Sequence, residues 1–377
     1  MKRTISLKLL HTAEQVKAFE DLAETFAAGC NEIVPYSVEH RCWNRPDLHR
    51  LCYYDIRASY PTLGSQMVCI AIHRVASAYK TLKSNKGIKR GEPIPLIKFN
   101  SKSVHFDKKT YSFKNGNLSL FTMNGRMIVP FVMGSHQFNL LKQGLPKEAE
   151  LICKKGQWYF NLVLDLPDVS PMPGNGVLGV DVGENNLAAT SSGRVFYGNK
   201  LRHDRDKYLA HRRRLQSNGS QSAKQRLRKI SGKEQRHVKH VNHCISKAIV
   251  AEAFSTGTSE IRLEDLTHIR DRIKAGKRVR ARLHRWAWRQ LQDFVAYKAQ
   301  GVGITVNYVN PAYTSQTCSV CHKLGIRAKH SFTCPHCGNV AHSDINGARN
   351  IATFARVLTP ARGSVNCPNV RPNAQLG

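Results

Sequence analysis

The sequence predicts a multidomain α+β protein, in which an N-terminal antiparallel β domain with a helical insertion precedes a C-terminal α/β domain with a small cysteine-rich insertion. Three observations support this class. Short strands with turn signals fill residues 91–170, strands alternate with long helices after residue 176, and two C-x-x-C pairs lie near the end of the chain. At about 150 residues per domain, 377 residues suffice for two or three domains.

The β domain is predicted from residues 1–12 and 91–170. Apolar and polar residues alternate in the N-terminal strand and in five or six short strands of the second segment. Asn115-Gly116 and Asn124-Gly125 favour type I′ hairpin turns, and a further hairpin is expected around Lys155-Gly156. Strands of this length and spacing are typical of an antiparallel barrel or sandwich. The helical segment between them is then an insertion.

The helical insertion is predicted over residues 13–90. It begins with a capping box formed by Thr12 and Gln15, followed by apolar residues at helical spacing. Three prolines, beginning with Pro35, interrupt the next stretch. Because proline breaks helix interiors, we expect short helices there.

The C-terminal α/β domain follows a linker at residues 166–176 that is rich in proline and glycine. We predict that it comprises residues 176–311 and 340–358, with residues 312–339 as the inserted cysteine-rich unit. The final segment, residues 359–377, is rich in proline, glycine and asparagine and is expected to be a disordered tail.

The chain is strongly basic, with a net charge of +32 from 58 Lys+Arg and 26 Asp+Glu. Two stretches concentrate this charge. Residues 201–243 hold 13 basic and 3 acidic side chains, and residues 270–289 hold 9 basic and one acidic. A solvated helix face is the alternative, but such faces usually mix both signs. The excess therefore indicates a polyanionic partner, for which nucleic acid is the usual candidate.

Membrane and secretory classes are excluded by the hydrophobic pattern. No apolar run approaches the roughly 18 residues of a transmembrane helix, and the N-terminus lacks the continuous apolar stretch of a signal peptide. We expect no membrane partner and a cytoplasmic location.

Four of the eleven cysteines form two pairs, Cys318-Ser-Val-Cys321 and Cys334-Pro-His-Cys337. Two such pairs present four thiolates, which complete a tetrahedral site for one Zn²⁺. The 12 residues between them are fewer than the usual number, but a short β-hairpin can span them. Because four thiolates fill the site, we expect a structural zinc without a catalytic role. A redox pair or two disulfides are the alternatives. Four nearby histidines are alternative ligands: His322, His330, His336 and His342.

Acidic residues are scarce in the second half of the chain, so those present are informative. Asp181 lies within an apolar strand, where a buried charge is costly unless it is paired or bound to a metal. Glu264 ends another strand. Asp344, the only acidic residue after Asp293, lies at the expected start of the last helix, where an N-cap is the alternative role. Carboxylates on two strands and a helix start suit a two-Mg²⁺ phosphodiesterase, because hard divalent cations prefer carboxylate oxygens.

Four segments of the second half follow one another in an informative order. The segments are Gly179-Val-Asp181-Val-Gly183, Leu263-Glu264-Asp265-Leu266, the cysteine unit from Asn310 to Gly338, and Asp344-Ile-Asn346-Gly-Ala-Arg-Asn350. The first, second and fourth resemble the three motifs of a RuvC-like nuclease domain, and the third looks like the zinc ribbon inserted before the last motif. Together they resemble the TnpB family, the insertion-sequence proteins ancestral to type V CRISPR nucleases.

The resemblance implies an RNA-guided DNA endonuclease whose C-terminal domain has a RuvC/RNase H-like α/β fold. The N-terminal half matches only in architecture, as a wedge-like β-barrel with a helical recognition insertion. By this resemblance Asp181, Glu264 and Asp344 hold two catalytic Mg²⁺, and the four paired cysteines hold one structural Zn²⁺. The implied partners are a guide RNA derived from the element and double-stranded target DNA, with an element-encoded transposase as a further candidate. Such a protein would be associated with the nucleoid.

Two positions depart from the family pattern. His322 follows the first C-x-x-C pair where glycine is usual, and Gly347 stands where alanine is usual. Neither change removes a metal ligand. All three carboxylates are present, which argues against the nuclease-dead relatives that act as guided repressors.

The nucleic acids are expected to contact the two basic stretches mainly through phosphates, while sequence is read by base pairing. Trp286, Trp288 and Tyr313 are candidates for stacking on bases, with core packing as the alternative for the tryptophans. Three other functions stay open: a guide-independent transposase, a non-catalytic nucleic-acid-binding repressor, and a guide-independent junction resolvase.

Overall fold

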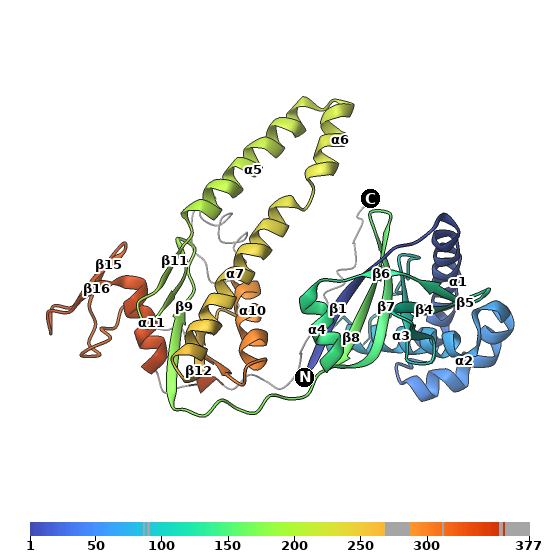
Figure 1. The fold of residues 1–377 in the computed structure, drawn as a ribbon, viewed down its shortest axis with the longest axis horizontal. Helices are drawn as coiled ribbons and strands as arrows, with labels where there is room; N and C mark the ends of the chain where they lie inside the picture. The colour runs from blue at the N-terminus through green and yellow to red at the C-terminus, as the bar shows by residue number, and fades with distance from the viewer. Residues whose placement is uncertain (86, 89–90, 268–286, 311–312, 354–356, 359–377) are drawn as a thin grey trace. The chain divides into compact units, whose positions relative to one another are not determined.

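A computed structural model describes the fold of residues 1–85, 87–88, 91–267, 287–310, 313–353 and 357–358 (Figure 1). The chain divides into two compact units at residues 167 and 168, within the proline-rich segment, and each unit has its own apolar core. In the described part of the chain, no helix combines the length and hydropathy needed to cross a membrane. Most of the basic stretch 270–289 and the whole expected tail 359–377 lie outside the described residues.

The strands of the first unit form two antiparallel sheets, of order β2-β7-β8-β1-β6 and β3-β4-β5. Their bounds are β1 Lys2–Leu9, β2 Ser103–Phe106, β3 Tyr111–Lys114, β4 Asn117–Thr122, β5 Gly125–Val129, β6 Phe131–Val132, β7 Leu145–Lys154 and β8 Gln157–Asp165. Lys155 and Gly156 join β7 to β8 with φ angles of 55° and 76°, both positive as a type I′ turn requires. Among the described strands neither sheet closes on itself, so the sandwich alternative fits this unit better than the predicted barrel.

The helices of the first unit are inserted between β1 and β2. They are α1 Ala13–Glu39, α2 Arg45–Ser59 and α3 Ser65–Ser84, and a fourth helix, α4 Ser135–Gln143, precedes β7. The predicted capping box is present, because the Gln15 N–H donates to Thr12 Oγ1 and the Thr12 N–H donates to Gln15 Oε1. Phe19 of α1 packs edge-on against Trp158 of β8, with ring centroids 5.5 Å apart. Helices and sheets therefore share one core.

Two local predictions in this unit are wrong, and one helix was missed. Pro35 lies inside α1, where buried Ile33 and Val34 hold the last turns against the core despite the lost hydrogen bond. Helix α4 is missing from the prediction: it is only nine residues long and none of them is fully buried, although Leu140 and Leu141 pack against the core. At Asn124-Gly125 only the glycine has positive φ, at 102°, so this turn is not type I′.

The second unit is built on a six-stranded sheet of order β11-β10-β9-β12-β13-β17. The bounds are β9 Gly176–Asp181, β10 Asn186–Thr190, β11 Val195–Tyr197, β12 Thr258–Glu264, β13 Thr305–Val309 and β17 Val357–Leu358. The neighbours β9, β12 and β13 are parallel, and the outer pairings are antiparallel. Helices α7 (Lys233–Ser255) and α10 (Trp288–Gln300) cover one face, and α11 (Ser343–Thr353) packs on the other (Figure 1).

Strand alternation decides which side chains meet each face of this sheet. In β9, Leu178 and Val180 belong to the core shared with α7 and α10. Gly179 and Asp181 therefore point toward α11. A Cβ atom at Gly179 would lie 2.0 Å from the carbonyl oxygen of Ala348, so only glycine permits α11 to approach this strand.

Two smaller elements complete the second unit. Helices α5 (Asn199–Asn218) and α6 (Gln221–Ile230), with the start of α7, form a helical hairpin that extends away from the sheet (Figure 1). Within the described residues of α5 and α6, only Leu201 and Ala223 are buried. Between β13 and α11 lies a three-stranded sheet of β14 Ile326–Ala328, β15 Ser331–Thr333 and β16 Val340–His342. This ribbon leads directly into α11.

Candidate functional site

Asp181 and Glu264 end adjacent parallel strands. Strand β12 pairs with β9 so that Leu263 lies opposite Val180, which places Glu264 beside Asp181. Ile261 and Leu263 belong to the core beneath α7 and α10. Glu264 therefore points to the opposite face of the sheet, as Asp181 does, toward α11.

Asp344 reaches the same face from the first turn of α11 and is 9% exposed. The Nδ2 atom of Asn186 donates to Oδ2 of Asp344 at 2.7 Å, and Nη2 of Arg327 donates to Oδ1 at 2.9 Å. The helix begins at Ser343, one residue earlier. Asp344 therefore lies within the helix and binds side chains, which does not fit the N-cap alternative.

The three carboxylates share one electrostatic environment. Burial raises the pKa of Asp181 well above its ordinary value, the charges of Glu264 and Asp344 raise it further, and Arg327 opposes them. Burial likewise raises the pKa of Glu264, against a hydrogen bond from Thr314 Oγ1 and the charge of Arg327. The site therefore resists full ionisation unless a cation offsets its charge.

This donor set fits divalent cations that prefer oxygen ligands. Mg²⁺ takes oxygen ligands and is usually held in proteins by one or two carboxylates together with water and substrate phosphates. Two-metal sites place their ions about 4 Å apart and share such carboxylates between them. A Cβ atom at Gly347 would lie only 3.1 Å from Oδ2 of Asp181. The departure from alanine at this position therefore leaves more room beside the carboxylate.

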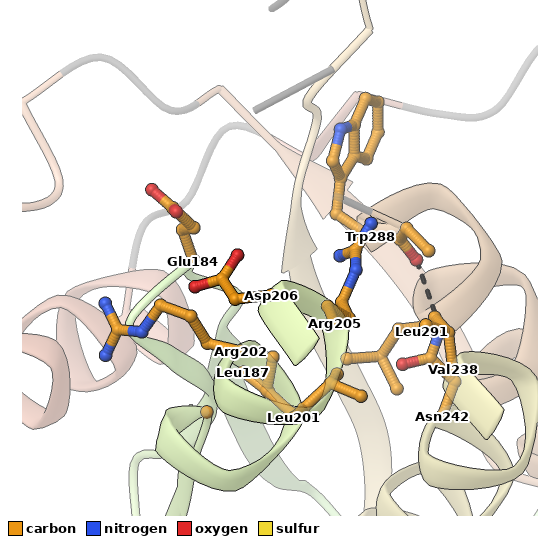
Figure 2. Close-up of a pocket in the computed structure, with 12 residues that line it drawn as sticks. Glu184, Leu187, Leu201, Arg202, Arg205, Asp206, Val238, Asn242, Trp288 and Leu291 are labelled. Atoms are coloured by element: carbon orange, nitrogen blue, oxygen red, sulfur yellow. Dashed lines mark hydrogen bonds between the residues drawn. The ribbon is translucent and has the colours of Figure 1, made fainter. Parts of the chain in front are cut away.

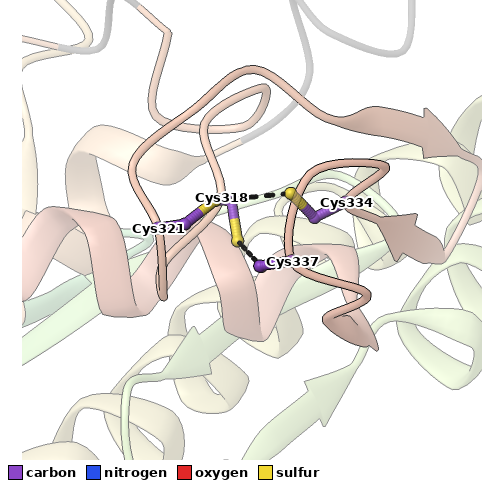
Figure 3. Close-up of side chains that lie close together, drawn as sticks. All are labelled: Cys318, Cys321, Cys334 and Cys337. Atoms are coloured by element: carbon purple, nitrogen blue, oxygen red, sulfur yellow. Dashed lines mark hydrogen bonds between the residues drawn. The ribbon is translucent and has the colours of Figure 1, made fainter.

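The four paired cysteines converge as the sequence predicts. Their Sγ atoms all lie within 4.8 Å of one another, and Figure 3 shows the four side chains pointing inward from two loops of the ribbon. The shortest cross-loop distances are 3.7 Å between Cys318 and Cys337 and 3.5 Å between Cys321 and Cys334. All four are free thiols. The geometry fits a tetrahedral Zn²⁺ site rather than the disulfide alternative.

The acidities of these thiols also fit a bound cation. Burial raises the pKa of Cys318, but N–H groups of Cys321 and Val320 and the side chain of Asn339 lower it to about 6. Cys337 shifts the other way: although the Asn339 N–H lowers its pKa, burial and hydrogen bonds with the other thiols raise it to about 12. Four thiolates therefore repel one another too strongly to coexist alone, and Zn²⁺ supplies the charge that would hold them together.

Two asparagines of α11 tie the helix to the segment that enters the ribbon. Asn346 accepts from the Ser319 N–H at 2.9 Å and donates to the carbonyl oxygen of Thr317 at 2.7 Å. Asn350 donates to the carbonyl oxygen of Thr314 at 2.8 Å. The helix that carries the third carboxylate is thus bonded to the base of the cysteine unit.

Three residues of this site were not found by sequence reasoning: Arg327, Asn186 and Thr314. Arg327 is one of many basic residues, and only the ribbon fold brings it to Asp344. Asn186 did carry a signal, since it is a polar residue at the start of an apolar strand, Asn-Leu-Ala-Ala-Thr. Thr314 follows a tyrosine with positive φ (65°), which no local pattern reveals.

The candidates for base stacking differ in how exposed their side chains are. Trp288 is 7% exposed and packs in the core, whereas Tyr313 is 67% exposed. Trp286 lies outside the described residues. Of the basic stretches, 201–243 is fully described, and most of its Lys and Arg side chains are exposed on the helical hairpin.

A separate cavity of about 40 Å³ lies at the foot of the helical hairpin, between α5, α7 and α10 (Figure 2). Leu187, Leu201 and Val238 line it with apolar groups, and Arg202 and Asp206 line it with charged ones. A volume of this size holds a few water molecules at most, and no nucleotide.

Two family models match the chain in its second half. Residues 162–270 match a family described as "Probable transposase", OrfB_IS605, and residues 288–351 match the Cas12f1-like TNB domain. These ranges contain Asp181, Glu264 and Asp344, as well as the four paired cysteines.

Whole-chain comparisons extend the similarity. The chain is 29% identical over 262 residues to a TnpB-like protein of Methanocaldococcus jannaschii, covering 65% of this chain and 91% of that protein. It is 27% identical over 350 residues to the CRISPR-associated endodeoxyribonuclease Cas12f1 of Sulfoacidibacillus thermotolerans, covering 81% of each. The fold is similar to that of the mini-RNA-guided endonuclease CRISPR-Cas_phi3, with a TM-score of 0.59, 10% identity, and coverage of 93% and 92% of the two chains.

Proposed function

We propose that the chain, which resembles a TnpB-like protein and matches a transposase family model, is an RNA-guided DNA endonuclease of an insertion element that cleaves target DNA beside a short motif. The observation that carries this proposal is the convergence of Asp181, Glu264 and Asp344 on one face of the α/β sheet. A protein that only bound nucleic acid would have no use for three mutually repelling carboxylates, one buried and two half-buried, in a chain of net charge +32.

We assign the three carboxylates to a RuvC-like centre that holds two Mg²⁺. Bound there, the ions would activate a water molecule and stabilise the leaving oxygen of the phosphodiester. Asn186 fixes the orientation of Asp344, and Thr314 fixes that of Glu264. The guanidinium of Arg327 brings a positive charge to the same site, where the scissile phosphate would gain negative charge in the transition state.

We assign Cys318, Cys321, Cys334 and Cys337 to one structural Zn²⁺. Its role would be to hold the ribbon so that Arg327, on β14, stays within reach of Asp344. Complete chelation should release about one zinc per chain from the purified protein.

The basic surface would hold the guide RNA and its heteroduplex with target DNA. Lys and Arg side chains of residues 201–243 are exposed on the helical hairpin, where they can neutralise phosphates without reading sequence. The β domain (residues 1–12 and 91–170) and the helical insertion (residues 13–90) would read the short motif beside the target, and Tyr313 would stack on a base. With chromosomal DNA as its target, the protein would act at the nucleoid.

Sequencing the RNA that co-purifies with the protein, expressed from its intact element, tests the guided function. We expect one discrete RNA, and the purified complex should cut a plasmid that carries the matching target. The Asp181→Ala variant should retain the RNA and lose cleavage. Asp265→Asn is the matched control, because this neighbouring carboxylate bonds Thr267 instead of facing the site.

Two outcomes would refute the proposal. Unchanged cutting by Asp181→Ala would remove the metal assignment. Cutting at element ends without any bound RNA would favour a guide-independent transposase, the second candidate, which the match to a transposase family supports.

A further inference from the structure

A second cluster of metal-ligating groups shares Asp344 with the carboxylate site. One ring nitrogen each of His330 and His342 and one oxygen of Asp344 all lie within 4.8 Å of one another. The two imidazole rings face each other at an interplanar angle of 28°, with centroids 5.7 Å apart. Two imidazoles and a carboxylate are a ligand set that selects transition metals over Mg²⁺.

Backbone bonds on both sides hold this cluster in place. His330 lies at the β14–β15 turn, and its carbonyl oxygen accepts from the Ser343 N–H at 2.9 Å. Ser343 Oγ donates to the carbonyl oxygen of Lys329 at 3.0 Å, and the register of β15 with β16 places Ser331 opposite His342. The histidines are thus placed by the ribbon and the first turn of α11, and a metal would need only side-chain rotations to bring its ligands together.

We propose that His330, His342 and Asp344 form a transition-metal site, of the kind that binds Zn²⁺, and that its occupation withdraws Asp344 from the proposed catalytic centre. The site rests on the ligand geometry alone, and its inhibitory effect rests on the proposed nuclease function. Asp344 already binds Arg327 and Asn186 through its two oxygens. A transition metal at this side chain would therefore compete with Arg327, Asn186 and Mg²⁺ for the roughly four lone-pair sites of one carboxylate.

Metal ions should differ in how strongly they compete for Asp344. Sites with nitrogen ligands bind Zn²⁺ and Ni²⁺ more tightly than they bind Mn²⁺. They bind Mg²⁺ most weakly, because this ion prefers oxygen ligands. Low concentrations of Zn²⁺ should therefore inhibit cleavage in excess Mg²⁺, Mn²⁺ should inhibit less, and a chelator weak enough to spare the cysteine site should restore activity.

Zinc titration of the full protein–RNA complex tests the proposed histidine site by measuring bound metal instead of DNA cleavage. The cysteine site is loaded with zinc beforehand. Isothermal calorimetry should show one further Zn²⁺ per chain, and the double variant His330→Asn, His342→Asn should lose it. Asparagine at position 342 can still accept the Asp344 N–H that now bonds His342 Nδ1, which preserves the helix start. His322→Asn is the matched control, because this exposed ribbon histidine lies outside the cluster and asparagine tolerates its positive φ of 61°.

The cleavage assay then tests the consequence. The double variant should need about tenfold or more Zn²⁺ for half-inhibition than the wild type or His322→Asn. A wild-type complex that binds only the cysteine-site zinc, or a double variant that keeps the second ion, would refute the site. A second ion without inhibition would refute only the withdrawal of Asp344. If no variant cuts DNA at all, the proposed function fails while the zinc count still decides the site.

Discussion

Asp181 is the residue at which burial and like charge act together most strongly. Its pKa is raised well above the ordinary value by burial first and by Glu264 and Asp344 second. In the metal-free protein, the folded state therefore binds a proton at pH values where the unfolded state has released it. The free energy of unfolding should fall as pH rises from the ordinary aspartate pKa through the raised folded-state pKa.

Asp181→Asn should remove this penalty. We expect the metal-free variant to melt at a higher temperature than the wild type at neutral pH and to match it in strong acid, because only the ionised carboxylate is destabilising. Mg²⁺ should raise the melting temperature of the wild type and have little effect on the variant. Thermal melts across pH, with and without Mg²⁺, measure both effects. A variant less stable than the wild type at neutral pH would contradict the predicted penalty.

Arg327 donates to Asp344 at 2.9 Å, and its charge lowers the pKa of both Asp181 and Glu264. Arg327→Ala should reduce the cleavage rate about 100-fold, as the loss of one transition-state donor typically does. Without the guanidinium the pKa of Asp181 rises further, so the acid limb of the pH–rate profile should move to higher pH.

The two controls for Arg327 separate charge from folding. Arg327→Lys should restore part of the rate and most of the pH profile, and Arg349→Ala should leave both unchanged because that side chain is exposed on α11. Equal losses in Arg327→Ala and Arg327→Lys, with no pH shift, would point to a structural role instead.

Site residues could be predicted from the sequence where their chemistry conflicts with their surroundings. Asp181 is a charge in an apolar strand, Asp344 is a lone acid in a basic tail, and the cysteines have metal-ligand spacing. Arg327 and Thr314 have no such local conflict. Their importance comes only from a ribbon fold that brings them to carboxylates 17 and 50 residues distant along the chain.

At the scale of elements, the contact between α11 and β9 positions the third carboxylate against the first. A Cβ atom at Gly179 would meet the carbonyl oxygen of Ala348 at 2.0 Å and the backbone nitrogen of Ala352 at 2.6 Å. Backbone atoms cannot move aside as flexible side chains can, so the helix itself would have to shift.

Gly179→Ala should therefore destabilise the second unit by about 3 kcal/mol, the upper part of the usual range for overpacking, and abolish cleavage. Denaturant unfolding monitored in that unit measures the loss. Gly193→Ala is the comparison at another glycine, where no atom lies within 4 Å and only the positive φ of 103° opposes the change. If Gly179→Ala keeps wild-type stability, the backbone of α11 does not lie against β9 at this position.

Elements were predictable where a local signal coincides with the tertiary environment. Asn115-Gly116 takes φ angles of 49° and 74°, and the hairpin at Lys155-Gly156 forms as expected. Helix α1 shows the opposite case, because packing of buried residues around Pro35 outweighs the local preference to end the helix. The division of the strands into two sheets depends on strand pairings between distant segments, which periodicity does not encode.

At the scale of the whole molecule, the charge of +32 destabilises the compact state through self-repulsion, and a bound polyanion would offset this repulsion. Much of this positive charge lies on exposed side chains that do not pack in the core. In the described α5, Arg212, Arg213 and Arg214 are exposed, and Leu201 is that helix's single buried residue. Charges of this kind contribute little to folding and are available for phosphates.

Replacing Arg212, Arg213 and Arg214 together by glutamine should weaken RNA binding without lowering the melting temperature of the RNA-free protein. Each lost phosphate contact removes one released counterion, so the slope of log affinity against log salt should become shallower by about 2 to 3. The matched control replaces the same three residues by lysine, which keeps the charge and should keep the slope. Filter binding over a salt series measures both variants. A glutamine variant with an unchanged slope would place the guide RNA on another surface of the protein.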